Sequence, residues 1–191
     1  YLASGTSRQP TLISDDLNGY DTLQFDGTDD YLKNGNYVME QPAEFWFVIY
    51  STNAVAGASI PLLASTNNTG QTVLGKSGGH TYASAGTSVQ MFSGGPRTNA
   101  WSVIGFVLNG ANSTTYTNGR QALVINPGAN TGSGLTVGSL YWLGGGAWDG
   151  KLAALVMFRT NLGSISTAGT FCTGARYDLY HYLTNKYAIA P

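Results

Sequence analysis

Residues 115–125, which read TYTNGRQALVI, contain the clearest local structural signal of the chain. Asn118 and Gly119 stand between two β-prone runs, TYT before them and QALVI after them. Asn and Gly both tolerate the positive φ angles of a type I′ turn, whose twist matches that of two paired antiparallel strands. The segment therefore predicts a β-hairpin and, with it, an antiparallel sheet.

Further strand signals lie on both sides of this hairpin. Three continuous apolar runs are FWFVIY at 45–50, WSVIGFVL at 101–108 and LAALVMF at 152–158. Such runs are typical of strands that are covered on both sides or face a broad core. Leu23 and Phe25 alternate with polar residues and are expected on one strand face. The segments 75–95 and 126–134 are rich in Gly, Ser, Thr and Asn, and are read as loops or irregular strands.

Only the C-terminal region has a helical pattern. Leu179, Tyr180, Leu183 and Tyr187 follow one another at spacings of three and four, which gives one apolar stripe on a helix. We expect a short helix at about 173–186, lying against the strands. Many short strands with one terminal helix predict an all-β fold, a sandwich or jelly roll.

Composition excludes several classes of protein. Charged residues make up only 10% of the chain, against about 25% in typical domains, and the net charge is −1. The nine basic residues are spread singly, whereas nucleic-acid binding needs a clustered basic surface. We therefore expect no nucleic-acid partner. Because no apolar run approaches the length of about 18 residues that spans a bilayer, we also expect no membrane insertion.

The chain length of 191 residues fits one domain, residues 1–191. Its single cysteine, Cys172, excludes an intrachain disulfide and is expected to be a buried small hydrophobe. The chain begins at Tyr1 without an initiator Met or a signal peptide, and is interpreted as an excised domain or a processed product.

Four ordered segments resemble a known family. They are LQFDGTDDYL at 23–32, TYTNGRQ at 115–121, LGGGAWDGKLAALVMF at 143–158 and YLTNKYAI at 182–189. Together they resemble laminin-G-like domains of the concanavalin A-like lectin/glucanase superfamily, of the bacterial and phage type. The resemblance covers residues from about 10 to 189 and implies an antiparallel β-sandwich, the concanavalin A-like jelly roll, with one short C-terminal helix.

The resemblance also raises a question about the first strand. Family members commonly begin with a W-x-D-x-S-G-N-G strand before the part that aligns here. Either Tyr1 to Ser7 serves in its place, or a neighbouring subunit donates that strand.

The residues do not support catalysis. Retaining glycosidases need two carboxyl groups about 5–5.5 Å apart, and glucanases of this superfamily carry them on one strand. Here only Glu40 and Glu44 are available, without an Asp between them and with Pro42 interrupting a ladder. His80 and His181 lack the spacing of a zinc site. We expect a protein that is not an enzyme.

Asp26, Asp29 and Asp30 form an acidic cluster in a Gly/Thr-containing turn. Asp in such turns commonly caps its own backbone, so a structural turn without a metal or other cofactor is the preferred interpretation. A Ca²⁺ site is the alternative, because calcium takes six to eight oxygen ligands.

Glycan binding on a sandwich needs an exposed aromatic ring and polar groups for hydroxyls. Trp46 and Trp101 lie in apolar runs and are expected in the core. Trp142 and Trp148 flank a Gly-rich turn that could expose a ring. The candidate ligand-binding residues are Trp148 and Asp149, then Tyr116 and Asn118 on the hairpin, with Asn67 and Asn112 in polar loops.

Two functions follow from the residues and the resemblance. The first is a non-enzymatic, surface-displayed module that binds a glycan or cell-surface receptor, on a phage virion or a secreted bacterial protein, and is therefore extracellular. The alternative is a structural virion component, such as a head decoration, fibre or tail subunit. Its partner would be protein: other virion proteins or further copies of itself in a homo-oligomer.

Overall fold

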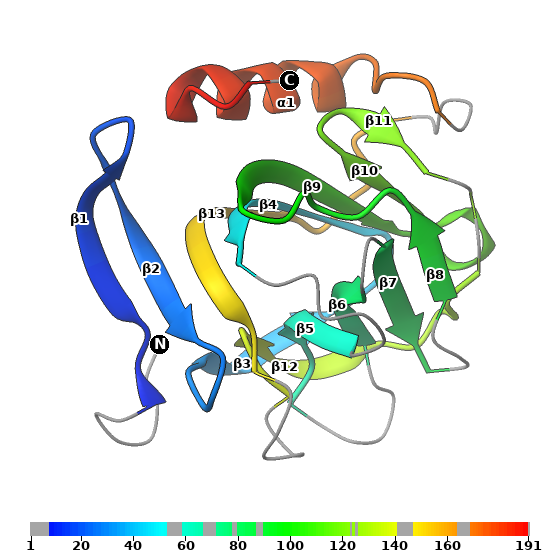
Figure 1. Ribbon diagram of the computed structural model, residues 1–191. Helices are drawn as coiled ribbons and strands as arrows, with labels where there is room; N and C mark the ends of the chain where they lie inside the picture. Colours follow the sequence, from blue (N-terminus) through cyan, green and yellow to red (C-terminus); the bar gives the residue numbers. More distant parts are fainter. Residues whose placement is uncertain are drawn as a thin grey trace.

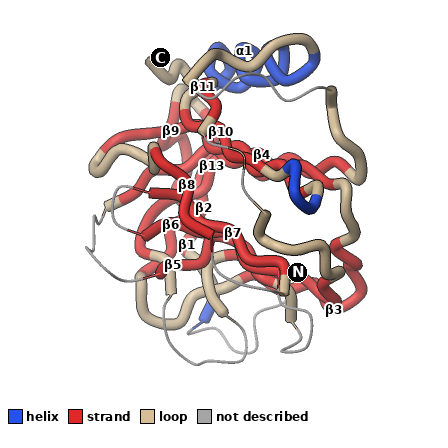
Figure 2. The backbone as a smooth tube through the Cα atoms, turned by 90° about the vertical axis from the view of Figure 1, so that its right-hand side faces the viewer, coloured by secondary structure: helices blue, strands red, loops and turns tan. Residues whose placement is uncertain are grey.

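The computed structural model of the protein describes residues 8–52, 59–66, 72–77, 80–86, 90–122, 124, 126–140, 147–163 and 169–190. They form three layers: a helix, a seven-stranded sheet beneath it and a six-stranded sheet below (Figure 1, Figure 2). The predicted antiparallel sandwich with a C-terminal helix is confirmed. The predictions for Tyr1 to Ser7, Asn67 and Trp142 lie outside the described residues.

All pairings between neighbouring strands are antiparallel. From edge to edge, the seven-stranded sheet consists of β1 (Thr11–Leu17), β2 (Tyr20–Asp26), β13 (Asp149–Phe158), β4 (Ala43–Ser51), β9 (Ala100–Leu108), β10 (Thr114–Thr117) and β11 (Arg120–Gln121). The six-stranded sheet consists of β3 (Leu32–Met39), β12 (Gly132–Val137), β5 (Ser59–Ala64), β6 (Thr72–Ser77), β7 (His80–Ala85) and β8 (Gln90–Ser93). A short 3₁₀ turn, η2 (Gly110–Asn112), precedes β10, and helix α1 spans Ala175–Tyr187.

Strand β4 is buried on both of its faces, which explains its unbroken apolar sequence. Phe45, Phe47 and Ile49 point into the core between the two sheets. Trp46 and Val48 point to the opposite face, into a second cluster that packs beneath helix α1. Because successive side chains of a strand alternate between faces, a strand between two apolar layers needs apolar residues at every position.

Gly105 in β9 makes room for the Trp46 ring on the helix-facing side of the sheet. A Cβ at Gly105 would lie 3.0 Å from ring atoms of Trp46. The ring also stacks on Tyr116, with centroids 5.6 Å apart and planes at 22°. This glycine therefore lets a large aromatic side chain lie flat on the sheet.

The predicted Asn-Gly hairpin is confirmed. Asn118 and Gly119 have φ angles of 48° and 78°, as a type I′ turn requires, and join β10 to β11. Strand β11 ends at Gln121, earlier than the sequence indicated. A second turn of the same kind, at Asn18 and Gly19 with φ angles of 52° and 78°, joins β1 to β2.

Helix α1 begins two residues after the predicted start and ends one residue after the predicted end, at Tyr187. Tyr180 and Leu183 are buried against the outer face of the seven-stranded sheet, as the apolar stripe predicted. Ala188 adopts a left-handed conformation, with φ 52°, and ends the helix. The helix thus closes the upper core in Figure 1.

The two segments that were expected to be loops or irregular strands contain strands. Residues 75–95 include the end of β6, β7 and β8, and residues 126–134 include the first residues of β12. Small residues fit there because the interior leaves little room: a Cβ at Gly132 would meet the Ser65 Cβ at 2.6 Å. The first described strand, β1, is the edge of the seven-stranded sheet and pairs with β2. The expectation of a strand formed by Tyr1 to Ser7 or donated by a neighbour concerns residues outside the described part of the chain.

None of the helices among the described residues is long and apolar enough to span a membrane.

Candidate functional site

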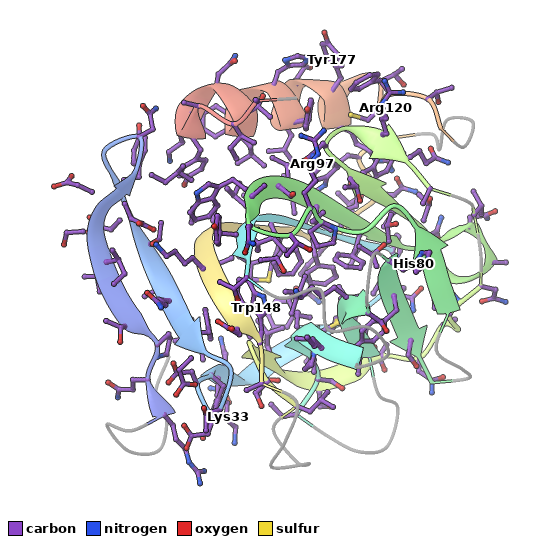
Figure 3. The ribbon with its side chains drawn as sticks, in the orientation of Figure 1. Lys33, His80, Arg97, Arg120, Trp148 and Tyr177 are labelled. Atoms are coloured by element: carbon purple, nitrogen blue, oxygen red, sulfur yellow. The ribbon has the colours of Figure 1, made fainter. Side chains whose placement is uncertain are left out.

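A pocket of about 570 Å³ lies where the β10–β11 hairpin meets the segment before helix α1. Three parts of the chain line it: the segment after β8, the hairpin, and Phe171. Its lining side chains include those of Arg97, Thr117, Asn118, Arg120, Gln121 and Phe171. In Figure 3, Arg97 and Arg120 lie on the same side of the molecule, close to α1.

The hairpin wall of the pocket is held by hydrogen bonds to neighbouring segments. The Thr117 hydroxyl donates to the Gly94 carbonyl, which ties the hairpin to the segment after β8. The Asn118 side-chain carbonyl accepts a hydrogen bond from the Val103 amide at 2.9 Å. The Asn118 backbone amide donates to the Val103 carbonyl at 2.8 Å, whereas the side-chain nitrogen Nδ2 donates to none of the described residues and lies at the half-buried rim.

Phe171 is placed by a set of backbone hydrogen bonds between its segment and the hairpin. The Gln121 amide donates to the Thr170 carbonyl at 2.9 Å, and the Cys172 amide donates to the Gly119 carbonyl at 2.8 Å. Between these bonds Arg120 pairs with Phe171 in an isolated antiparallel bridge. The Phe171 ring remains 39% exposed. It therefore offers apolar surface to the pocket from a fixed backbone.

The charge of the pocket is positive. Both of its charged lining residues, Arg97 and Arg120, are exposed, and neither forms an ion pair with a carboxylate of the described residues. The Arg120 guanidinium lies 4.6 Å from the centre of the Phe171 ring, and its Nη1 donates to the Gly169 carbonyl at 3.3 Å. These contacts hold the Arg120 guanidinium in one orientation and do not neutralise its positive charge.

Tyr180, on helix α1, lies beside the pocket. Its ring and that of Phe171 lie over Gly119, where an added Cβ would meet both at 2.9 Å. Burial raises the pKa of Tyr180, the nearby Cys172 raises it further, and the charges of Arg97 and Arg120 oppose this shift. The two guanidinium charges therefore act on one hydroxyl, which accepts and donates no hydrogen bond among the described residues.

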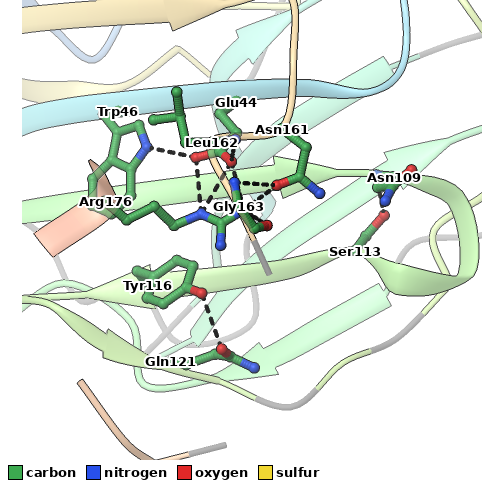
Figure 4. Close-up of polar contacts among 10 residues, drawn as sticks. All are labelled: Glu44, Trp46, Asn109, Ser113, Tyr116, Gln121, Asn161, Leu162, Gly163 and Arg176. Atoms are coloured by element: carbon green, nitrogen blue, oxygen red, sulfur yellow. Dashed lines mark hydrogen bonds and ion pairs between the residues drawn. The ribbon is translucent and has the colours of Figure 1, made fainter. Parts of the chain in front are cut away.

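A buried polar network extends from Glu44 and Arg176 to Gln121, which lines the pocket (Figure 4). The Glu44 carboxylate is fully buried and accepts hydrogen bonds from Arg176 Nη2 at 2.6 Å and from Trp46 Nε1 at 3.2 Å. The Arg176 guanidinium lies 5.7 Å from the Tyr116 ring centre, and the Tyr116 hydroxyl donates to Gln121 Oε1 at 3.0 Å. Gln121 lines the pocket, so this network links the ion pair to the site.

The structure corrects two of the predicted ligand-binding residues. Trp148 is only 1% exposed and packs against Phe25, with ring centroids 5.1 Å apart, in the core between the sheets. Tyr116 is fully buried under Arg176. Tyr116 points inward because successive side chains of a strand alternate between its faces. Trp148 immediately precedes β13, and its backbone amide donates to the Gly138 carbonyl at 2.7 Å, which holds this residue in the core.

The other predicted ligand-binding residues do not form one site. Asn118 lines the pocket. Asn112 is exposed in η2, and Asp149 is half-buried at the start of β13, paired with Asp26 of β2. Asn67 lies outside the described residues. The structure thus brings one of these residues into the pocket together with two arginines and a phenylalanine.

The acidic turn is stabilised by its own side chains. The carboxyl oxygens of Asp26, Asp29 and Asp30 lie within 4.8 Å of one another. Asp26 Oδ1 accepts hydrogen bonds from the Thr28 and Asp29 amides at 2.8 Å and 3.3 Å. Asp30 Oδ2 accepts one from the Asp26 amide at 3.0 Å. In these hydrogen bonds the Asp side chains cap the backbone of their own turn, as the structural interpretation of the sequence expects. Burial also raises the pKa of Asp30, which makes its charged form less favourable.

The two glutamates of the chain are in different environments. Glu44 is buried against Arg176, whereas Glu40 forms an ion pair with Arg159 at the surface. Cys172 is 1% exposed, and burial raises the pKa of its thiol to about 11, so the prediction of a buried apolar role is confirmed.

Arg97 and Phe171 were not identified from the sequence. Each stands in a turn-rich stretch without a strand or helix pattern, and they are 74 residues apart. Arg120, by contrast, lies within the recognised hairpin TYTNGRQ. The local signal that pointed to this part of the molecule is the Asn-Gly turn, from which Asn118 was predicted as a ligand-binding residue.

No family model and no curated protein sequence matches the chain. Solved structures do match it at low sequence identity. A native heptameric SAP-like pentraxin from Limulus polyphemus is 17% identical, with a TM-score of 0.57 over 74% of this chain and 77% of the pentraxin. Domain 4 of AbnA, an extracellular arabinanase from Geobacillus stearothermophilus solved with arabinotriose, is 11% identical, with a TM-score of 0.58 over 89% and 81%.

Two other matches are parts of longer chains. Domains LG4–5 of the mouse laminin α1 chain are 14% identical, with a TM-score of 0.55 over 71% of this chain and 40% of the laminin fragment. A Trypanosoma rangeli sialidase is 10% identical, with a TM-score of 0.60 over 98% of this chain and 34% of the sialidase. Identities this low show the fold alone: the chain is a concanavalin A-like jelly-roll sandwich.

Proposed function

We propose that the protein is a non-enzymatic binding module that takes a glycan in the pocket beside the β10–β11 hairpin. The observation that carries this proposal is the meeting of an exposed aromatic ring, Phe171, with the polar groups of Thr117, Asn118 and Arg120 in one concave site. Ligand sites combine apolar contact with a few placed hydrogen-bonding groups, and sugars present both kinds of surface.

The pocket walls are suited to this role because they are held in place before any ligand arrives. Thr117 is fixed to Gly94, Asn118 to Val103 and Arg120 to Gly169. A ligand therefore orders few further side chains, which lowers the entropy cost of binding. The free amide N–H groups of Asn118 can donate to sugar hydroxyls at the rim.

The solved relatives support a glycan as the ligand class. The arabinanase domain was solved with arabinotriose, and related sialidase structures were solved with sialic acid. We place the protein outside the cell, on a phage virion or a secreted bacterial protein, in accord with the resemblance of its four sequence segments to bacterial and phage laminin-G-like domains.

The test is a glycan array probed with the purified chain and two variants. Phe171→Ala removes the exposed ring of the pocket and is expected to abolish or strongly weaken binding. Tyr182→Ala is the matched control, because Tyr182 is 58% exposed on helix α1 but does not line the pocket. Equal loss in both variants, or unchanged binding in Phe171→Ala, would contradict the assignment of this pocket.

A second function, assembly into a virion, is favoured by the edge strand β1. This strand ends the seven-stranded sheet, and Leu12 on it is 60% exposed. An unpaired strand edge with an exposed apolar residue favours pairing with another chain. Light scattering on a sizing column tests this: a defined oligomer that Leu12→Asp converts to monomer supports assembly, and a wild-type monomer contradicts self-assembly through this edge.

A further inference from the structure

We infer that the pocket selects glycans that carry a negatively charged group, a carboxylate or a sulfate, and that Arg97 and Arg120 hold this group. The inference rests on the proposed glycan-binding function and specifies its ligand class.

The ion pairs of the protein leave both pocket arginines without a described carboxylate partner. Four of the basic residues have carboxylate partners: Arg8 with Asp29, Lys151 with Asp16, Arg159 with Glu40 and Arg176 with Glu44. Arg97 and Arg120 form no such pair with any described carboxylate. In a chain with only nine basic residues, two exposed and unneutralised guanidinium groups share one pocket.

Both arginines face one pocket that has no acidic residue among its described lining residues. They line the same pocket, and their charges both act on the Tyr180 hydroxyl beside it. No acidic residue is among the lining residues. The two like charges are therefore not balanced locally, and an anion between them would be attracted by both.

The guanidinium group is chemically suited to bind an oxyanion. Its planar fork of N–H donors matches the two oxygens of a carboxylate or a sulfate, and such charge-assisted hydrogen bonds are about twice as strong as neutral ones. Arg120 is held over the Phe171 ring and against the Gly169 carbonyl, so its fork is oriented before binding. Phe171 then contacts the apolar part of the same sugar, while Asn118 reaches its hydroxyls.

The experiment compares matched ligands by isothermal titration calorimetry and on an array. The array carries oligosaccharides that differ only in whether one sugar is neutral, carboxylated or sulfated. The proteins are the wild type, Arg97→Gln, Arg120→Gln and Arg159→Gln. The last is the charge-matched control, because Arg159 is exposed and lies outside the pocket.

An acidic glycan is expected to bind at least about tenfold more tightly than its neutral counterpart, and about tenfold more tightly to the wild type than to Arg97→Gln or Arg120→Gln. Arg159→Gln is expected to bind as the wild type does. Comparing the carboxylated with the sulfated glycan identifies which of the two anions is preferred. Affinity is expected to fall as salt rises, because the ion pairs are exposed.

Other outcomes separate this inference from the proposed function. If neutral glycans bind as tightly as acidic ones, and both pocket arginine variants bind normally while Phe171→Ala does not, the acidic ligand class is wrong and the glycan-binding function stands. If no glycan of any class binds, both are wrong. If free sulfate binds as well as a sulfated glycan, the pocket recognises the anion without the sugar and the inference fails.

Discussion

Arg176, on helix α1, and the two pocket residues Arg97 and Arg120 are used in opposite ways. Arg176 is 1% exposed, and its guanidinium donates to Glu44, Asn161 and the Gly163 carbonyl. Arg97 and Arg120 are exposed and have no carboxylate partner among the described residues. A guanidinium surrounded by internal acceptors fixes structure, while one left with unused donors at a pocket is available to a ligand.

The largest expected effect is on the free energy of unfolding, when the buried residue Arg176 is replaced. Arg176→Met leaves the Glu44 carboxylate buried without its ionic partner, and such a loss typically costs about 3–5 kcal/mol of unfolding free energy. Urea denaturation followed by tryptophan fluorescence measures it. Arg159→Met is the control: its pair with Glu40 is exposed and should contribute less than about 1 kcal/mol. Similar small losses in both variants would mean that the buried network does not stabilise the fold.

Two aromatic residues provide the next contrast. Trp148 is buried in the core, so Trp148→Ala should cost about 3–5 kcal/mol of stability. Phe171→Ala should change stability far less, by at most about 1 kcal/mol, but remove ligand binding. Chemical denaturation and the glycan array, applied to both variants, distinguish the two. A stable Trp148→Ala protein that has lost only binding would place the ligand at Trp148 instead.

The two Asn-Gly turns allow a finer test, because Gly19 and Gly119 have the same φ angle of 78°. Alanine at either position should cost about 1 kcal/mol through backbone strain. At Gly19 an added Cβ meets nothing within 4 Å, whereas at Gly119 it meets Phe171 and Tyr180 at 2.9 Å. Gly119→Ala should therefore be the less stable variant in thermal denaturation and should also weaken binding. Equal melting temperatures would show that the two rings move aside without cost.

The smallest expected effect concerns the half-buried pair of Asp16 and Lys151, away from the pocket. The hydrogen bond from Lys151, followed by that from Thr22, lowers the pKa of Asp16 below its usual value. A lowered pKa in the folded state means that this stabilisation is present above pH about 4 and is lost as the pH falls through the folded-state pKa. Asp16→Asn should reduce the loss of stability between pH about 5 and about 2, by less than about 1 kcal/mol. Denaturation curves at several pH values measure the difference.

The sequence predicted those parts of the molecule that depend on neighbouring residues. The turn at Asn118 and Gly119, the doubly buried strand that contains Phe45 and Trp46, and helix α1 each follow from a local pattern. Trp148 was misplaced because its Gly-rich neighbours indicated exposure, whereas its ring packs on Phe25, which is distant in the sequence.

The pocket was predicted only in part for the same reason. Asn118 was identified because it belongs to a local turn motif. Arg97 and Phe171 join it only through contacts between distant segments: the hydrogen bond from Thr117 to Gly94 and the bridge between Arg120 and Phe171. No spacing pattern in the sequence encodes either contact. The positive charge of the site could not be predicted because its two arginines are 23 residues apart in a nearly neutral chain.

The backbone bonds that join the hairpin to residues 169–172 connect the pocket to helix α1. The wall that carries Phe171 leads directly into that helix, which begins at Ala175. Binding of the proposed ligand at the pocket would therefore be thermodynamically linked to docking of the helix, and the linkage would be reciprocal. A bound ligand would slow amide hydrogen exchange along α1. A substitution that destabilises the helix would lower the affinity for the ligand without contacting it.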